Sequence, residues 1–115
     1  MVNSASPEGP GGSAAGSAAE AAGQRPLDGI LVADFSRVLA GPLCTMTLAD
    51  LGGRVVKVER PGAGDDTRSW GPPWSETGST YFESVNRNKE SVCLDLSNPD
   101  DLQAARELAL RADVL

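Results

Sequence analysis

The sequence of 115 residues has no histidine, two cysteines and only 4% aromatic residues. Without an imidazole, the chain has no Ser-His-Asp or Cys-His nucleophile, no histidine general base and no zinc site with histidine ligands. Cys44 and Cys93 are far apart in the chain and form neither a CxxC pair nor a disulfide framework. We therefore expect two reduced thiols in the core, and no metal site.

Positive charge and long apolar runs are also scarce. Lys and Arg number 10 against 16 Asp and Glu, which gives a formal net charge of −6. This charge argues against nucleic acid or an anionic membrane surface as a main partner. No apolar run approaches the roughly 20 residues of a membrane span, and no apolar stretch suits a secretory signal. We expect a cytoplasmic protein that binds neither nucleic acid nor a membrane.

Residues 1–25 differ in composition from the rest of the chain. Ala, Gly, Ser and Pro fill 18 of these 25 positions, and after Met1 and Val2 there is no Ile, Leu, Phe, Trp or Tyr. Such a segment buries too little apolar surface to offset the entropy of ordering its backbone. We interpret residues 1–25 as a disordered tail and expect the folded domain to comprise residues 26–115.

The folded part begins with a strand, a helix and a second strand. Residues 30–34 are a short apolar block that ends in an acid, as in a parallel strand buried on both faces. A proline and two glycines bracket a helix from about 42 to 51. The valines of residues 54–59 predict the second strand. Together these segments form a βαβ unit, whose crossover we expect to be right-handed.

The second half of the domain starts with a turn-rich loop, residues 60–80, which is long enough to suggest a functional role. A brief helical stretch near residues 79–85 and a third strand at residues 91–96 follow. Asn98 and Pro99 then start a helix over about 99–112. Residues 113–115 resemble the opening of a fourth strand, which suggests truncation; the alternative is a short final edge strand. The fold class is α/β: a truncated Rossmann-like parallel sheet with about three strands, the start of a fourth and two main helices.

Apolar spacing predicts which side chains are buried. The first helix has apolar residues at helical spacing, namely Leu43, Met46 and Leu51. The last helix has one apolar face made of Leu102, Ala105, Leu108 and Ala109. In the turn-rich loop, we expect the two indole rings of Trp70 and Trp74 to cover an edge of the core.

Ligands of open α/β sheets bind beyond the carboxyl ends of the strands, where three segments of this chain fall. Residues 36–42 lead into the first helix, and their small side chains allow a ligand to approach the backbone; an ordinary loop is the alternative. Arg60 ends the second strand, where its guanidinium can hold a phosphate or pair with Asp65 or Asp66. Residues 84–89 interleave amides with bases, which suits either anion binding or ties to the neighbouring backbone.

At these same residues the sequence resembles the N-terminal part of a class III CoA-transferase, the CaiB/BaiF family. The resemblance covers about residues 26–115 and rests on several motifs in the family's order: PLDGI at 26–30, DFSRVLAGP at 34–42, DLG at 50–52, VVKVERPGAGDDTR at 55–68 and SVNRNKES at 84–91. Within the family, the WGPPWSETGST segment at 70–80 is most similar to the branch that handles dicarboxylic acids such as glutarate or succinate.

The resemblance implies transfer of CoA from one carboxylic acid to another through enzyme-bound anhydride and thioester intermediates. The family's nucleophile is an aspartate well downstream of the matched region, so no catalytic residue is assigned here and we expect the chain alone to be inactive. CoA or acyl-CoA and a carboxylic acid are the implied substrates, with no tightly bound cofactor. The family also implies an interlocked homodimer for the full-length protein.

The resemblance also implies CoA-binding positions. Arg60, in the VERP motif, matches the family's contact to the nucleotide part of CoA. The adenine site is lined, largely through the backbone, by the stretch that matches Leu94, Asp95, Leu96 and Ser97. The loop near the thioester matches Val38, Leu39 and Ala40. Two alternatives stay open: an acyl-CoA racemase of the same superfamily, and a non-catalytic remnant or binding module.

Overall fold

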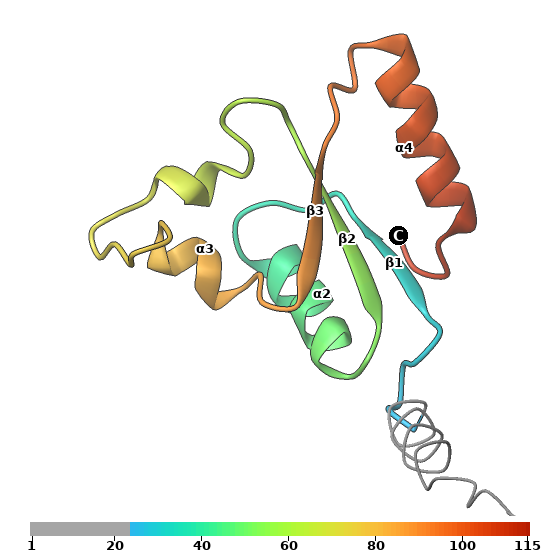
Figure 1. Cartoon of the computed structure of the whole chain (residues 1–115), viewed down its shortest axis with the longest axis horizontal. Helices are drawn as coiled ribbons and strands as arrows, with labels where there is room; N and C mark the ends of the chain where they lie inside the picture. Colours follow the sequence, from blue (N-terminus) through green and yellow to red (C-terminus); the bar gives the residue numbers. More distant parts are fainter. Residues whose placement is uncertain (1–23) are drawn as a thin grey trace, which may run out of the picture.

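The computed structural model describes residues 24–115, so the predicted tail lies almost entirely outside the described residues. Seven elements follow one another along the chain (Figure 1): strand β1 (Leu31–Asp34), helix α2 (Ala40–Asp50), strand β2 (Arg54–Glu59), the short 3₁₀ helix η1 (Asp66–Ser69), helix α3 (Thr80–Ser84), strand β3 (Lys89–Cys93) and helix α4 (Pro99–Arg111). The predicted alternation of strands and helices is confirmed.

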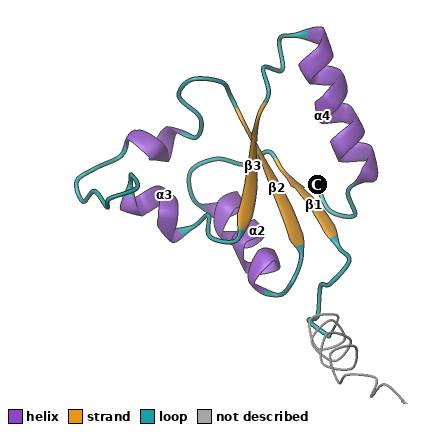
Figure 2. Cartoon of the chain, in the orientation of Figure 1, coloured by secondary structure: helices purple, strands orange, loops and turns teal. Residues whose placement is uncertain are grey.

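The three strands form one parallel sheet in the order β1-β2-β3 (Figure 2). After α4 the chain returns to the open side of β1, where Val114 forms a parallel bridge with Val32. The carbonyl oxygen of Val114 accepts a hydrogen bond of 2.9 Å from the amide of Ala33. The predicted start of a fourth strand is therefore correct, and this strand start lies beside β1.

The two longer helices pack on opposite faces of the sheet. On one face, Ala49 of α2 packs against Val32 and Val55 in the buried core. Successive side chains of a strand point to opposite faces, so Val56 lies on the other face. There it lines a shallow space together with Leu108 of α4. Lys57 and Glu59 share the α2 face with Val55, and this placement decides their environment.

Helix α2 buries a different stripe from the one predicted. Its buried residues are Pro42, Met46 and Ala49, whereas Leu43 and Leu51 are 45% and 42% exposed. Of the three predicted residues, only Met46 is buried. Pro42 and Ala49 lie one turn before and one turn after Met46, so these three residues form the face that meets the sheet. Helix α4 follows its prediction more closely. The side chain of Asn98 caps it by accepting a 2.9 Å hydrogen bond from the amide of Asp100.

Three other expectations are wrong in detail. Strand β3 comprises Lys89–Cys93 rather than 91–96, because the chain turns at Asp95, whose carbonyl accepts a hydrogen bond from the amide of Asn98. Both cysteines are free, as expected, but exposed rather than in the core. Trp70 and Trp74 are about half-exposed, and Trp70 makes an edge-to-face contact with a tyrosine instead of covering the core. Within residues 24–115, no helix has the length and apolar character needed to cross a membrane.

Candidate binding site

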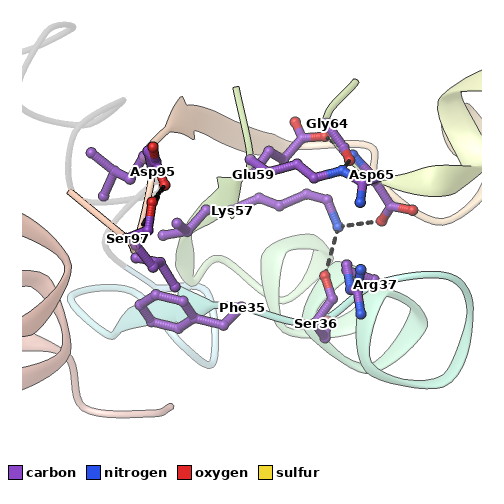
Figure 3. A pocket seen from close by; sticks show the side chains of 13 residues that line it. Phe35, Ser36, Arg37, Lys57, Glu59, Gly64, Asp65, Asp95 and Ser97 are labelled. Atoms are coloured by element: carbon purple, nitrogen blue, oxygen red, sulfur yellow. Dashed lines mark hydrogen bonds and ion pairs between the residues drawn. The ribbon is translucent and has the colours of Figure 1, made fainter. Parts of the chain in front are cut away.

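A cavity of about 320 Å³ opens at the carboxyl ends of all three strands (Figure 3). Its walls come from residues 35–37 after β1, residues 57–60 at the end of β2, and residues 94–97 after β3, completed by Gly64 and Asp65. This is the position at which an open parallel sheet binds its ligands. The cavity therefore lies where the sequence predicted a ligand.

A buried ion pair forms one wall. The Lys57 ammonium lies 2.9 Å from the Asp65 carboxylate, and their side chains are 1% and 0% exposed. The same ammonium donates a 3.1 Å hydrogen bond to the carbonyl oxygen of Ser36 (Figure 3). Burial raises the pKa of Asp65, but hydrogen bonds from Lys57 and Thr67 outweigh burial and hold this pKa below its usual value. Asp65 is therefore charged at neutral pH and already paired with Lys57.

Glu59, which also lines the cavity, forms a second pair with Arg68. Its carboxylate accepts two 2.7 Å hydrogen bonds from Arg68 and one of 2.5 Å from the hydroxyl of Ser91. The Arg68 guanidinium also lies 3.8 Å from the centre of the Phe82 ring. The Arg68 hydrogen bonds lower the pKa of Glu59 to about 2, against the opposing effect of its burial. Glu59 is therefore a structural anion and does not suit a general base.

Asp34 and Lys89 form the third buried pair, at 3.0 Å. Lys89 also donates 2.9 Å hydrogen bonds to the carbonyl of Pro42 and to the side chain of Asn86. Arg87 pairs with the carboxylate of Asp50. The segment 84–89 thus ties neighbouring parts of the backbone together, which supports the structural alternative over anion binding.

Sequence reasoning missed these buried charges, although a signal for them exists. Lys57 and Glu59 alternate with valines in the predicted second strand, so both side chains share one face with Val55, the face that α2 covers. A charge in that position needs a partner, because an unpaired buried charge costs several kcal/mol. The partners, Asp65 and Arg68, come from the loop before η1 and from η1 itself, and neither hydrophobic periodicity nor residue spacing points to them.

Arg60 lines the cavity, and its side chain is 52% exposed. Its Nε donates a 3.1 Å hydrogen bond to the carbonyl of Gly64, and its Nη2 pairs with Asp66. Both interpretations of Arg60 thus have support, because it borders the cavity and also pairs with a surface carboxylate. Arg37 lies on the wall as well, with Nη1 at 3.7 Å from the other oxygen of Asp66.

Residues 94–97 line the same cavity as Arg60. The Asp95 carboxylate accepts hydrogen bonds from the amide and the hydroxyl of Ser97, at 3.0 and 2.6 Å, which lower the pKa of Asp95. The amide of Asp95 donates a 2.8 Å hydrogen bond to Asp101 in α4. These bonds hold the turn after β3 in place, so its backbone forms a fixed border of the cavity.

The structure does not bring Val38, Leu39 and Ala40 to this cavity, whose walls they do not line. Val38 has a left-handed φ of 72°, and its amide lies 3.4 Å from both carboxylate oxygens of Asp65. Gly41 cannot be replaced by a larger residue without a steric clash. A Cβ on Gly41 would lie 2.2 Å from the Cβ of Ser36. The small residue at position 41 therefore allows the loop to pack on α2.

Fold and cavity together define a parallel α/β domain with a cavity at the carboxyl ends of its strands. Comparison with known families makes this class specific, since the model of CoA-transferase family III matches residues 27–115. The chain belongs to CoA-transferase family III.

Curated relatives agree with this assignment. The succinyl-CoA:glutarate CoA-transferases of Mus musculus and Homo sapiens are 58% and 56% identical to the chain over 90 residues. The acetyl-CoA:oxalate CoA-transferase of Acetobacter aceti is 49% identical over 90 residues. Each alignment covers 78% of this chain but only 20–23% of the relative. The chain thus spans about a fifth of the length of the curated relatives it matches.

Solved structures show the same partial match. A CaiB/BaiF family protein from Brucella suis superposes with a TM-score of 0.72 at 45% identity, over 77% of this chain and 25% of the other. A hypothetical protein from Mycobacterium tuberculosis gives a TM-score of 0.66 at 42% identity, over 78% of this chain and 24% of the other. The described fold is therefore one part of the fold of larger family members.

Proposed function

We propose that this chain is the CoA-binding N-terminal portion of an enzyme that moves CoA between carboxylic acids. The observation that carries the proposal is that Arg60 and residues 94–97 border one cavity. The family resemblance matches these two segments, which are far apart in the chain, to the contacts with the nucleotide part of CoA. A guanidinium suits the phosphates, because it offers charge-assisted hydrogen bonds in a planar fork.

The substrates in this proposal are an acyl-CoA and a dicarboxylic acid, such as succinate or glutarate. The names of the curated relatives support a transferase over a racemase, since they are CoA-transferases acting on succinyl, glutarate, oxalate or mesaconate groups. The succinyl-CoA:glutarate enzymes are 58% and 56% identical to the chain, compared with 49% for the acetyl-CoA:oxalate enzyme. CoA is a substrate here, and the proposal includes no tightly bound cofactor.

The reacting carboxylate of the proposed mechanism is an aspartate outside these 115 residues. It would attack the acyl-CoA to form an anhydride and release the CoA thiolate, which would then attack the aspartyl carbonyl, form a thioester and release the donor acid. The acceptor acid would displace CoA from this thioester to form a second anhydride, and the CoA thiolate would attack the acceptor acyl group, which frees the aspartate. The acids near the cavity suit other tasks, since Glu59 and Asp65 are buried and paired with bases. We therefore expect no CoA transfer by the 115-residue chain with succinyl-CoA and glutarate, although it binds CoA.

Calorimetric titration of the chain with CoA tests the proposal. Arg60→Ala should weaken CoA binding by about 1–3 kcal/mol, the usual value of a charge-assisted hydrogen bond. Arg54→Ala is the matched control, because Arg54 is also exposed and paired with a carboxylate, but lies on the α4 face. Equal affinities of the unsubstituted chain and Arg60→Ala would remove Arg60 from the site. CoA transfer by the chain alone would contradict the assignment of the nucleophile.

The coding sequence past Leu115 distinguishes two alternatives: a fragment of a CoA-transferase and a non-catalytic binding module. An open frame with a downstream aspartate supports the transferase, and a stop codon supports a non-catalytic remnant.

For the full-length protein we propose an interlocked homodimer, which would cover apolar side chains such as Leu39, Leu43 and Leu110. Light scattering of the full-length protein tests this oligomeric state. The cytoplasmic location expected from the sequence remains a prediction.

A further inference from the structure

Two arginines at the cavity share a single carboxylate. Arg37 comes from the loop after β1 and Arg60 from the end of β2, and both line the cavity. Asp66, at the start of η1, reaches Arg60 with one oxygen and Arg37 with the other, the latter at 3.7 Å. With two guanidiniums to one carboxylate, this group, which we call the Arg–Asp–Arg cluster, has an excess of one positive charge.

The cluster differs from the other charged groups around the cavity. Lys57, Glu59 and Asp65 are almost fully buried, and a ligand cannot displace their partners without leaving a buried charge unpaired. Arg37 and Arg60 are 59% and 52% exposed. Exposed ion pairs contribute only about 0–1 kcal/mol, so another anion can displace the carboxylate at small cost.

The opposite border of the cavity carries no exposed cation. Asp95 and Ser97 lie at one side of the cavity and Arg37 at the other (Figure 3). Asp95 is exposed and acidic, and it already accepts two hydrogen bonds from Ser97. An anionic group of a ligand is therefore attracted to the Arg–Asp–Arg cluster and repelled from the border formed by residues 94–97.

We propose that Asp66 competes internally with a phosphate group of the ligand for Arg37 and Arg60. Without a ligand, its carboxylate keeps both guanidiniums beside the cavity. When a phosphate binds, it takes the place of Asp66 and contacts Arg37 as well as Arg60. This inference rests on the proposed function and adds to it a second phosphate-binding residue and a residue that limits affinity.

The test titrates CoA into the unsubstituted chain and into Asp66→Asn, Arg37→Ala and Arg60→Ala. Asp66→Asn should bind CoA about two- to fivefold more tightly, the equivalent of an exposed ion pair. Arg37→Ala should bind about tenfold more weakly through loss of a charge-assisted contact. Glu90→Gln is the matched control for Asp66→Asn, because Glu90 also holds an exposed arginine, Arg54, at a distance from the cavity.

Pantetheine serves as the second probe, because it has no phosphate. Asp66→Asn should leave the affinity of the chain for pantetheine unchanged. An equal gain in affinity for pantetheine and for CoA would overturn the inference. The CoA-induced rise in melting temperature provides a second measurement, since a ligand of the folded state stabilises it even in a marginally stable variant. Each variant is compared by circular dichroism with the unsubstituted chain.

The outcomes separate this inference from the proposed function. If Arg60→Ala weakens CoA binding but Asp66→Asn and Arg37→Ala do not change it, the inference is wrong and the CoA site stands. Weaker binding by Asp66→Asn would mean that the carboxylate positions the arginines for the ligand instead of competing with it, which also overturns the inference. If the unsubstituted chain binds no CoA, both fail.

Discussion

The ammonium of Lys57 lies 2.9 Å from the carboxylate of Asp65, and water reaches almost none of either side chain. One residue belongs to β2 and the other to the loop before η1, so this pair fixes the loop to the sheet beside the cavity. A buried pair of this kind contributes little net stability compared with an apolar pair, but the loss of one partner leaves an uncompensated charge. The cavity wall therefore depends on both residues at once.

Lys57→Met should lower the free energy of unfolding by about 3–5 kcal/mol, because it leaves Asp65 buried without its cation. Arg54→Met is the matched control, since Arg54 is a base of the same strand, β2, in an exposed pair with Glu90 of β3. That change should cost about 0–1 kcal/mol. Urea unfolding of the two variants measures the difference, and equal losses would show that Lys57 is not buried as described.

Acid should destabilise the fold between about pH 4.5 and pH 2. The pKa of Glu59 falls from 4.5 to about 2 in the folded chain, where Arg68 holds its charged form. A lowered folded pKa stabilises the protein above the unfolded pKa, and this stabilisation is lost as the pH falls toward the folded value. We expect a loss on the order of 2 kcal/mol, since half-exposed Arg68 is screened by water.

Unfolding free energies of the chain and of Glu59→Gln, measured across this pH range, test the effect. The variant should be less stable at pH 7 and should change less on acidification. The lowered pKa values of Asp34 and Asp65 act in the same direction, so part of the acid sensitivity stays in the variant. Identical pH profiles of the unfolding free energy for the chain and for Glu59→Gln would exclude Glu59 as a source of the acid sensitivity.

Two neighbouring glycines should respond differently to alanine. Gly62 and Gly64 both have a positive φ, at 79° and 63°. A Cβ on Gly62 meets nothing within 4 Å, whereas one on Gly64 would lie 2.7 Å from the carboxylate of Glu59 and 3.0 Å from Arg68. Gly62→Ala should cost about 1–2 kcal/mol of stability from backbone strain alone. Gly64→Ala should cost about 1–3 kcal/mol more, from crowding, and thermal unfolding of both variants shows whether it does.

The isolated chain should be marginally stable. Strand β3 pairs only with β2 among the described strands, and residues such as Leu110 are largely exposed. A domain of this size buries a smaller fraction of its surface than a large domain does, so exposed apolar area weighs heavily. Circular dichroism should record a broad thermal transition at low temperature. A sharp cooperative transition of the monomer at high temperature would contradict this expectation.

The sequence predicted the elements of the fold better than their buried faces. Strand β2 has the predicted bounds, because a run of valines ends at a turn. Helix α4 starts at Pro99, because Asn98 and Pro99 are strong start signals. For α2, apolar character alone favoured Leu43 and Leu51, yet tertiary packing buries Pro42 and Ala49. Residue type does not reveal which side of a short helix meets the sheet.

The position of the cavity was predicted, but its buried charges were not. Carboxyl ends of parallel strands meet at one edge, so topology placed Arg60 at the edge where ligands bind, whereas residues 94–97 were proposed only from the family resemblance. Both segments border the cavity. The contact of Asp66 with Arg37 depends on how a long loop folds back over the sheet. Local propensity and spacing contain no information about such a contact.

The paired charges of the α2 face limit how this family can vary in sequence. An apolar replacement of Lys57 alone exposes Asp65 to an environment without a counter-ion, and the same holds for Lys89 and Asp34. Tolerated changes at these positions should therefore occur together, base with acid. In an alignment of relatives, the two members of each pair should covary, whereas Arg54 and Glu90 should drift independently.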